Sequence, residues 1–393
     1  MSDEKLLNDD MPMIPRYRVL SRVSIMAEKL DYNHEMMNVP EMWKSTKGEG
    51  VKVVVLDTGV PDHLDLQVQG GHSFIPGYEA DENGHGTHVG GIIAAIANNG
   101  MGVAGIAPDC EDSYGAVLNG SGSGNIQAII DGIRWAVDDV GAHVINMSLG
   151  IDAGVPIVPE LEQACDYARE QGCLVVCAAG NENWRVGQPA VFDSTVAVAA
   201  VDNAKERANF SNYGPEVMFS AGGVDVYSTY LNNAYVKLSG TSMSSPALAG
   251  IAALIIADDL KDGKTLSPDE VIEKLKKISF DVGDDGFDEL YGHGIPVFVS
   301  PENPENPENP ENPENPENPE NPENPEEPEN PEEPEEPQSP CRIGLPMAKA
   351  FLDAAVKGLD QNKSAEDSVS DGIRAAQKFA GRIDRQGRGT RDG

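Results

Sequence analysis

The chain is organised around residues 240–254, which read Gly-Thr-Ser-Met-Ser-Ser-Pro and then Ala-Leu-Ala-Gly-Ile-Ala-Ala-Leu. The second part contains no polar side chain, which is typical of a helix buried in a protein core. The first part is a run of small residues, so we expect a turn that exposes the hydroxyl of Ser242 at the mouth of this helix. Unpaired N–H groups at a helix N-terminus favour the negative charge of an attacking alkoxide or an oxyanion. Taken alone, the pattern more often marks a serine that caps a helix.

Two other stretches supply the partners that a reactive serine needs. Residues 51–56 form a β-branched, apolar run of strand length that ends in Asp57. Open α/β sheets place their chemistry at the carboxyl ends of such strands. His85 and His88 lie in a glycine-rich turn that runs into a second apolar segment. An aspartate, a histidine and a serine can act together as orienting group, base and nucleophile.

These three stretches, in this order, resemble the subtilisin family of serine proteases, whose triad serves as a general example of this chemistry. The resemblance implies that Asp57 orients the imidazole, that His85 is the base and that Ser242 is the nucleophile. His88 would be a packed neighbour rather than a base. The resemblance also implies a three-layer α/β fold with a mostly parallel central sheet. The expected function is that of a serine endopeptidase acting on protein or peptide substrates through an acyl-enzyme intermediate.

The same resemblance assigns further residues to substrate binding. Asn181 matches the amide of the family's oxyanion hole and would act together with the backbone N–H of Ser242. The stretches 120–125 and 144–150 would hold an extended peptide between them as an added strand. The substrate-binding residues expected on this basis are Ser123, Gly124, Ser148, Leu149, Gly150, Ala178, Ala179 and Gly180. Residues 183–190 are shorter than usual at the floor of the specificity pocket, so the preferred substrate residue stays open.

A structural calcium ion is the cofactor that the resemblance implies. Ca²⁺ takes six to eight oxygen ligands, which include carboxylates and backbone carbonyls. The residues in the family's ligand positions are Glu28, Asp65, Ala97, Asn99, Met101 and Val103. By itself, the loop from 97 to 103 has the composition of an ordinary turn. A second cation site is left open, because Met218 stands where some members of the family have an acid.

Residues 1–26 form a polar leader with one apolar patch. Subtilisins are commonly made with an inhibitory leader, and the intracellular members carry a short Leu-Ile-Pro-Tyr element in it. The stretch Met13-Ile14-Pro15-Arg16-Tyr17 looks similar, with an additional arginine. Together with Pro-Glu-Met-Trp at 40–43, this places the chain nearest the intracellular subtilisins. The leader is therefore a candidate inhibitory propeptide, and the alternative is an N-terminus without fixed structure.

Composition limits the partners and the compartment. The chain has 29 Lys and Arg against 65 Asp and Glu, a net charge of −36. Nucleic acids and anionic membranes repel such a chain, and no apolar run reaches transmembrane length. Cys173 and Cys177 lie on one side of a predicted strand, too far apart to form a disulfide. Reduced thiols and the absence of a recognisable signal peptide favour a cytoplasmic protein, with non-classical export left open.

The composition changes twice beyond the expected catalytic domain, which spans residues 27–299. Proline recurs every third residue across 300–340, together with glutamate and asparagine. Without apolar side chains to form a core, this repeat is expected to be an extended linker. Residues 341–393 contain two apolar stripes at helical spacing, so we expect a small helical tail. Its role is unknown, and it would either self-associate or bind a protein partner.

Two other classes of function compete with a protease. A non-catalytic protein on the same fold could use the groove only to hold peptides, although an intact triad and Asn181 argue against it. Alternatively, the repeat and the tail could form a scaffold that carries the protease domain. Reaction of Ser242 with a fluorophosphonate would separate an enzyme from a binding protein.

Overall fold

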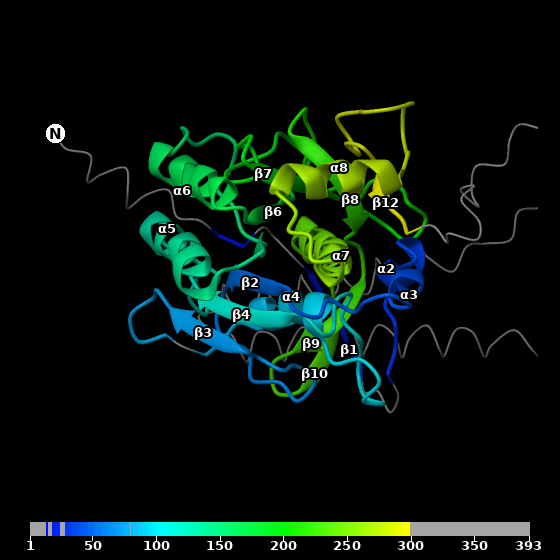
Figure 1. The fold of residues 1–393 in the computed structure, drawn as a ribbon. Helices are drawn as coiled ribbons and strands as arrows, with labels where there is room; N and C mark the ends of the chain where they lie inside the picture. Colours follow the sequence, from blue (N-terminus) through cyan, green and yellow to red (C-terminus); the bar gives the residue numbers. More distant parts are fainter. Residues whose placement is uncertain (1–12, 15–17, 24–27, 79, 299–393) are drawn as a thin grey trace, which may run out of the picture. The chain divides into compact units, whose positions relative to one another are not determined.

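The structure is a computed structural model that describes residues 13–14, 18–23, 28–78 and 80–298 (Figure 1). The expected linker and tail, 300–340 and 341–393, lie outside the described residues, as does most of the leader. The central element is a seven-stranded sheet in which every neighbouring pair is parallel. In spatial order its strands are β3 (Gly70–Ser73), β4 (Glu111–Ala116), β2 (Lys52–Asp57), β5 (Val144–Met147), β6 (Leu174–Ala178), β7 (Thr195–Val201) and β8 (Val217–Gly222).

Strands β2, β6 and β7 are apolar along most of their length, as expected for strands that are covered on both faces of the sheet. In β2, Val53 and Val55 join one hydrophobic cluster, whereas Val54 and Leu56 join another. Successive side chains of a strand point to opposite faces, so each strand contributes to two cores. This explains why the sequence shows continuous β-branched runs instead of alternation between apolar and polar residues.

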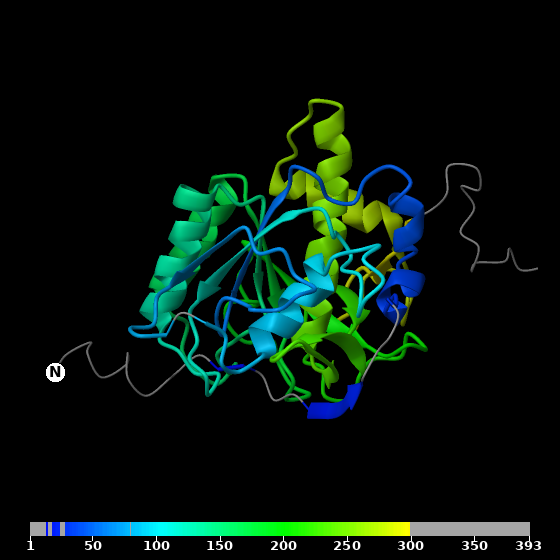
Figure 2. The ribbon, with the colours of Figure 1, turned by 90° about the horizontal axis from the view of Figure 1, so that it is seen from below.

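Helices cover both faces of the sheet. On one face lie α5 (Ile126–Trp135) and α6 (Pro159–Glu170), which Figure 1 shows together on one side of the strands. On the other face lie α4 (His85–Ala94) and α7 (Thr241–Lys261), which run side by side in Figure 2. The predicted three-layer α/β fold with a mostly parallel sheet is confirmed.

Smaller elements complete the domain. The short helices α2 (Tyr32–Met36) and α3 (Val39–Met42) precede the sheet, and a π-helical turn, η2 (Ala136–Val140), continues α5. Helix α8 (Pro268–Ile278) packs against α7 and is followed by the two short strands β11 (Ser279–Phe280) and β12 (Ile295–Pro296). Helix α8 begins after its N-cap Ser267, which forms a capping box with Glu270.

A second sheet was not predicted. It is antiparallel and consists of β1 (Arg18–Val23), β10 (Ala234–Ser239) and β9 (Val226–Tyr230), with β10 in the middle. Strand β1 belongs to the leader. Strand β10 ends at Ser239 and leads within three residues to Ser242, at the start of α7. The leader therefore contributes a strand next to the segment that carries the proposed nucleophile.

Two further predictions concern thiols and membranes. Cys110, Cys165, Cys173 and Cys177 are free and buried, so the described cysteines form no disulfide, as expected for Cys173 and Cys177. Burial raises the pKa of each of these thiols. Within the described ranges, α7 alone is long and apolar enough to cross a membrane, but 89% of its apolar window is buried inside the domain. Its composition is therefore that of a core helix.

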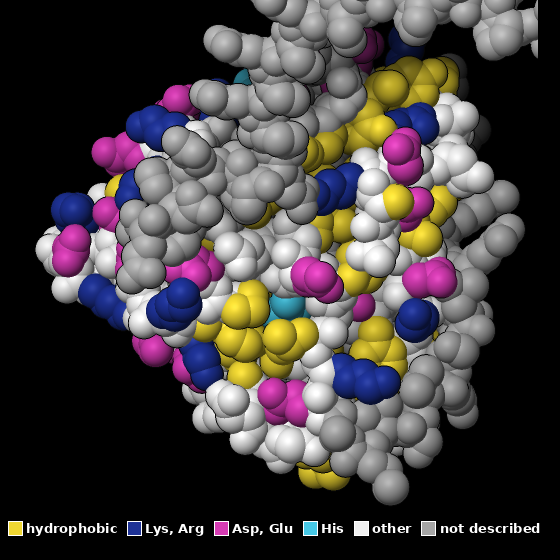
Figure 3. Space-filling view, turned by 90° about the vertical axis from the view of Figure 1, so that its right-hand side faces the viewer, with side chains coloured by type: hydrophobic (Ala, Val, Ile, Leu, Met, Phe, Trp, Pro, Cys, Tyr) yellow, Lys and Arg dark blue, Asp and Glu magenta, His cyan; other side chains and the backbone are white. Residues whose placement is uncertain are grey.

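One face of the surface shows how the charge is distributed. On the face drawn in Figure 3, acidic and basic side chains are interspersed, and hydrophobic side chains gather between them. On this face, therefore, the large negative net charge of the sequence does not produce an electrostatic field of a single sign.

Candidate active site

Asp57 and His85 meet at the carboxyl edge of the central sheet. Asp57 is the last residue of β2, and His85 is the first residue of α4. His85 Nδ1 lies 2.8 Å from Oδ1 and 3.0 Å from Oδ2 of Asp57, and both side chains are buried. Because Nδ1–H donates to the carboxylate, Nε2 is the ring nitrogen left to act as a base.

Asp81 holds this pair in place, a role that the sequence analysis missed. Its Oδ1 accepts the hydroxyl of Thr58 at 2.9 Å, and its Oδ2 accepts the backbone N–H and hydroxyl of Thr87 at 2.8 and 2.6 Å. The Thr58 hydroxyl in turn accepts the N–H of Gly86 at 2.9 Å. These bonds tie the residue after Asp57 to the first turn of α4. The sequence pattern that could have indicated this role is an acidic residue four positions before an apolar helix.

Ser242 lies in the first turn of α7 and is fully buried, so the predicted exposure of its hydroxyl is wrong. Its Oγ donates to the backbone carbonyl of Ser148 at 3.2 Å, and the Ser148 hydroxyl donates to the backbone carbonyl of Ser242 at 2.9 Å. The first turn of α7 is therefore packed against the residue that follows β5. The N-cap of α7 is Gly240, which excludes the alternative that Ser242 caps the helix.

Asn181 lies beside Ser242, just beyond the end of β6. Its Oδ1 accepts the backbone N–H and the hydroxyl of Thr241 at 2.8 and 2.9 Å. The Thr241 hydroxyl also accepts the N–H of Gly180 at 3.1 Å. A Cβ atom at Gly240 would lie only 3.0 Å from Asn181 Nδ2, so a side chain at this position would crowd the amide. The amide N–H₂ group is thus directed at the start of α7.

The two stretches expected to bind substrate hold a part of the chain's own leader. Met13 donates its N–H to the carbonyl of Gly150 at 3.0 Å and accepts the N–H of Gly150 at 3.1 Å. Met13 also forms an antiparallel bridge with Ser123, and Ile14 donates to the carbonyl of Gly122 at 3.0 Å. An extended segment therefore lies between the two stretches as an added strand.

The other expected substrate-binding residues border this groove. Ser148 and Leu149, both buried, lead from β5 to Gly150. Gly124 pairs with Leu118 and closes the turn that presents Ser123. The other expected residues, Ala178, Ala179 and Gly180, lie at the end of β6, the strand next to β5, and precede Asn181.

His88, which was expected to be a packed neighbour, and His293 both make structural contacts. His88 Nε2 lies 3.2 Å from the carbonyl oxygens of both Val226 and Val236, to which its N–H can donate. Complete burial lowers the pKa of His88 to about 3, which keeps the ring neutral. His293 contacts the rings of Phe219 and Phe287.

The residues expected to bind calcium surround a buried carboxylate. Asp65 accepts Asn99 Nδ2 on Oδ1, and on Oδ2 it accepts the N–H of Val103 at 3.1 Å and the hydroxyl of Tyr235 at 3.0 Å. Glu28 accepts the backbone N–H of Asn99 at 2.9 Å. Met101 donates its N–H to Asn99 Oδ1 at 2.8 Å, and Ala97 begins the loop. Tyr235 could not be anticipated, because it is distant in sequence.

Asp65 is the buried carboxylate at the centre of this cluster. Asp65 is fully buried, and among the described residues it forms no ion pair with Lys or Arg. Burial is the main cause that raises the pKa of Asp65, and a bound cation would offset that cost. The side-chain oxygens gathered here are carboxylate and amide oxygens, which are ligand types that Ca²⁺ takes.

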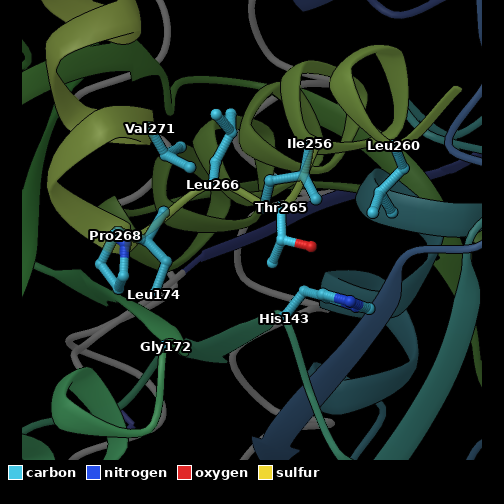
Figure 4. Close-up of a pocket in the computed structure, with 9 residues that line it drawn as sticks. All are labelled: His143, Gly172, Leu174, Ile256, Leu260, Thr265, Leu266, Pro268 and Val271. Carbon is cyan, nitrogen blue, oxygen red and sulfur yellow. The ribbon is translucent and has the colours of Figure 1, made fainter. Parts of the chain in front are cut away.

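A small pocket at the opposite edge of the sheet has a different character. It has a volume of about 10 Å³ and is lined mainly by apolar side chains, with His143, just before β5, at one side (Figure 4). Leu174, the first residue of β6, also lines it. The pocket is therefore at the amino edge of the sheet and does not include Asp57, His85 or Ser242.

Comparison with known proteins agrees with this geometry. The model of the subtilase family, Peptidase_S8, matches residues 48–294. The chain is 47% identical to subtilisin DY of Bacillus licheniformis over 63% of this chain and 89% of that protein. It is 50% identical to a thermostable alkaline protease of Halalkalibacterium halodurans over 53% of this chain and 57% of that protein. It is 40% identical to M-protease of Shouchella clausii over 70% of both chains. The chain therefore belongs to the subtilase family and is a subtilisin-like serine endopeptidase.

Proposed function

We propose that this chain cleaves peptide bonds through an acyl-enzyme intermediate on Ser242, with His85 as base and Asp57 as the group that orients it. The observation that carries the proposal is the bond from His85 Nδ1 to the Asp57 carboxylate, 2.8 Å long and buried at the sheet edge where α7 begins. This bond fixes the tautomer in which Nε2 can take a proton.

Each step then follows from the residues present. Ser242 Oγ attacks the substrate carbonyl while His85 Nε2 accepts its proton, and His85 later gives this proton to the departing amine. The Asn181 side-chain N–H and the Ser242 backbone N–H stabilise the negative oxygen of the tetrahedral intermediate. Water, activated by His85, then releases the acyl group. The buried positions of His85 and Ser242 strengthen the electrostatic interactions of these two groups.

A fluorophosphonate label tests the chemistry directly. The full-length protein should bind one label covalently at Ser242, and peptide mapping by mass spectrometry should locate it there. Ser242→Ala should remain unlabelled, whereas Ser245→Ala keeps the nucleophile and should still react. An unlabelled but folded full-length protein would instead support the rival function, a groove that only holds peptides.

We also propose that the leader, residues 1–26, is an inhibitory propeptide. Met13 and Ile14 occupy the groove by backbone pairing with Gly150 and Gly122, which would exclude a substrate. Together with the patch at 13–17, this supports placing the chain near the intracellular subtilisins. Deleting residues 1–25 should abolish any lag before activity, and Met13→Pro, which removes the N–H donated to Gly150, should shorten it. An equal lag in all three proteins would contradict this role.

A structural calcium ion is part of the proposal. Glu28, Asp65 and Asn99 would contribute side-chain oxygens, and Ala97, Met101 and Val103 would contribute backbone carbonyls. The buried carboxylate of Asp65 supports this assignment, because no described basic side chain neutralises it. The ion would stabilise the loop around Asn99 and take no part in the chemistry.

The rest of the chain has a proposed role in placement, not in catalysis. We propose protein or peptide substrates, a cytoplasmic location, an extended linker over 300–340 and a tail over 341–393 that self-associates or binds a protein. A protein ending at Val299 should hydrolyse a tetrapeptide substrate as fast as the full chain and lose only assembly or localisation. An unfolded truncated protein would show that the tail belongs to the catalytic domain.

A further inference from the structure

The start of α4 is bound from a second direction, by the last residues of strand β9. This strand lies against α4 (Figure 1). Three consecutive side-chain hydroxyls of β9 donate to backbone carbonyls around the first turn of the helix: Ser228 to His88 at 2.8 Å, Thr229 to Thr87 at 2.7 Å and Tyr230 to Asn83 at 3.0 Å. His85 lies between these acceptors in the sequence, so the three bonds enclose the proposed base.

The close approach of β9 depends on glycines in and before the helix. A Cβ atom at Gly91 would overlap the hydroxyl oxygens of Thr229 and Ser228, and a Cβ atom at Gly84 would overlap the ring of Tyr230. Gly84 also has a φ of 93°, in the left-handed region that favours glycine. The glycine-rich stretch around His85 is therefore fitted to this strand.

The peptide group between Asn83 and Gly84 is bound at both ends. Its carbonyl accepts the hydroxyl of Tyr230, and its N–H donates to Asp81 Oδ1 at 2.8 Å. Gly84 is the N-cap of α4 and provides no side-chain cap. Because His85 is the next residue, the orientation of this peptide group determines where the backbone of His85 lies and how its imidazole reaches Asp57.

We propose that Tyr230 is a positioning residue for the reaction. Its hydroxyl, together with those of Ser228 and Thr229, holds the start of α4 so that the His85 imidazole stays between Asp57 and Ser242. This inference rests on the proposed role of His85. Transfer of the Ser242 proton depends on the distance and direction of the acceptor nitrogen, and a misplacement of about 1 Å can lower the rate about 100-fold.

A matched pair of tyrosine substitutions tests the proposal. Tyr230→Phe keeps the ring over Gly84 and removes only the hydroxyl. Tyr227→Phe makes the same change on the same strand, where the hydroxyl is buried and has no hydrogen-bond partner among the described residues. On a tetrapeptide substrate, Tyr230→Phe should lower kcat about five- to tenfold and leave KM within about twofold. Tyr227→Phe should leave both constants unchanged.

A matched pair of serine substitutions separates positioning from stability. Ser228→Ala removes one buried hydroxyl that binds a carbonyl of α4. Ser220→Ala removes a buried hydroxyl of β8 that donates to the carbonyl of Tyr291 at 3.1 Å, away from α4. Both variants should lower Tm by similar amounts, because each loses one hydrogen bond of the same kind. Only Ser228→Ala should also lower kcat, about two- to threefold.

The rate of fluorophosphonate labelling gives a second readout of position. It should fall in parallel with kcat in Tyr230→Phe and Ser228→Ala, because the label also needs His85 to accept the Ser242 proton. It should not fall in Tyr227→Phe or Ser220→Ala.

The outcomes are distinct from those of the proposed chemistry. If Tyr230→Phe has the kcat of Tyr227→Phe, or changes only KM, the positioning role is overturned and the role of His85 stands. An equal fall of kcat in Ser220→Ala and Ser228→Ala would also overturn it, because lost stability would then explain the effect. If the unmodified protein neither cleaves the peptide nor reacts with the fluorophosphonate, the proposed function itself fails.

Discussion

The two edges of the central sheet use buried carboxylates in opposite ways. At the carboxyl edge, Asp57 ends β2 and has His85 as its partner at 2.8 Å. Near the amino edge, Asp112 is the second residue of the adjacent strand β4, opposite Val53, and its partner is the hydroxyl of Tyr114 at 2.7 Å. Burial raises the pKa of Asp112 to about 6, so the charged form is costly there.

The difference follows from where the helices begin. Helices α4 and α7 both start at the carboxyl edge, with His85 and Ser242 in their first turns. Helix N-termini supply N–H donors and a favourable field for negative charge, which makes this edge suitable for oxyanion chemistry. The amino edge has the small, mainly apolar pocket near Leu174 instead. Of the two buried carboxylates compared here, only the one at the carboxyl edge has a partner that can take part in catalysis.

The largest expected effect is at the carboxyl edge. Ser242→Ala should lower kcat by about 10⁶-fold on a peptide substrate, the scale measured for this family's own nucleophile. Thr265→Ala, in the amino-edge pocket, should leave kcat within about twofold, because it removes a hydroxyl far from the chemistry. Cleavage of casein by purified Ser242→Ala protein would contradict the assignment of the chemistry to the carboxyl edge.

A smaller effect is expected at the oxyanion site. Asn181→Ala should lower kcat by about 10²- to 10³-fold with little change in KM, since the lost donor acts on the transition state; this range comes from the family's own case. Thr241→Val removes the hydroxyl that donates to Asn181 Oδ1 at 2.9 Å and should give a smaller loss of kcat. Steady-state kinetics on one tetrapeptide measures both variants, and an effect confined to KM would refute the assignment.

Calcium should stabilise the fold, because it would neutralise the charge of a third buried carboxylate, that of Asp65. With calcium at about 100 times its Kd, the free energy of unfolding should rise by about 2.7 kcal/mol, and chelator should reverse this rise. The corresponding increase in Tm is about 5–10 °C for a domain of this size. Asp65→Asn should blunt the shift, whereas Asp62→Asn, an exposed neighbour, should not. A Tm indifferent to calcium and chelator would remove the site.

Asp112 gives the smallest predicted effect, and Asp112→Asn is the only one of these substitutions that should stabilise the fold. Its pKa of about 6 in the folded protein lies above the ordinary 3.8, so its stabilising contribution is complete below about pH 4 and is lost as the pH rises through 6. Asp112→Asn keeps an acceptor for Tyr114 and should raise the free energy of unfolding by about 1–3 kcal/mol at pH 8.

Urea unfolding at two pH values checks this sign. The gain of Asp112→Asn over the unmodified protein should nearly vanish at pH 4, where the carboxyl is already neutral. Glu111→Gln, at the exposed preceding residue of β4, should show little gain at either pH. A gain of equal size at pH 4 and pH 8 would mean that burial of charge is not the cause.

The sequence predicted the fold where periodicity and local signals agree. The strand before Asp57, the helix after Ser242 and the helix starting at Ser267 all have local causes: β-branched runs, apolar runs or capping residues. The proposed triad residues were found because each lies at one end of such an element: Asp57 ends a strand, and His85 and Ser242 lie in the first turns of helices. Their contact in space came from the family resemblance, since spacing alone does not bring Asp57 to His85.

The features that were missed depend on contacts between distant segments. The pairing of Arg18 with Ser239 joins residues far apart in the sequence, and no local pattern in the leader signals a strand. The burial of Ser242 depends on Ser148, in another element. The stabilising network of Asp81 had a local signal, its position before α4, but its bond to Thr58 did not.

The position of α7 has a consequence for how activity arises during synthesis. This helix carries Ser242 at its first turn and packs along β5, β6, β7 and β8 with the rest of its length. Asp57 and His85 are translated long before it. A nascent chain therefore has no complete active site until most of the sheet has been made and α7 has closed its core. Because one helix both completes the core and carries the proposed nucleophile, incompletely translated chains should have no proteolytic activity in the cell that makes them.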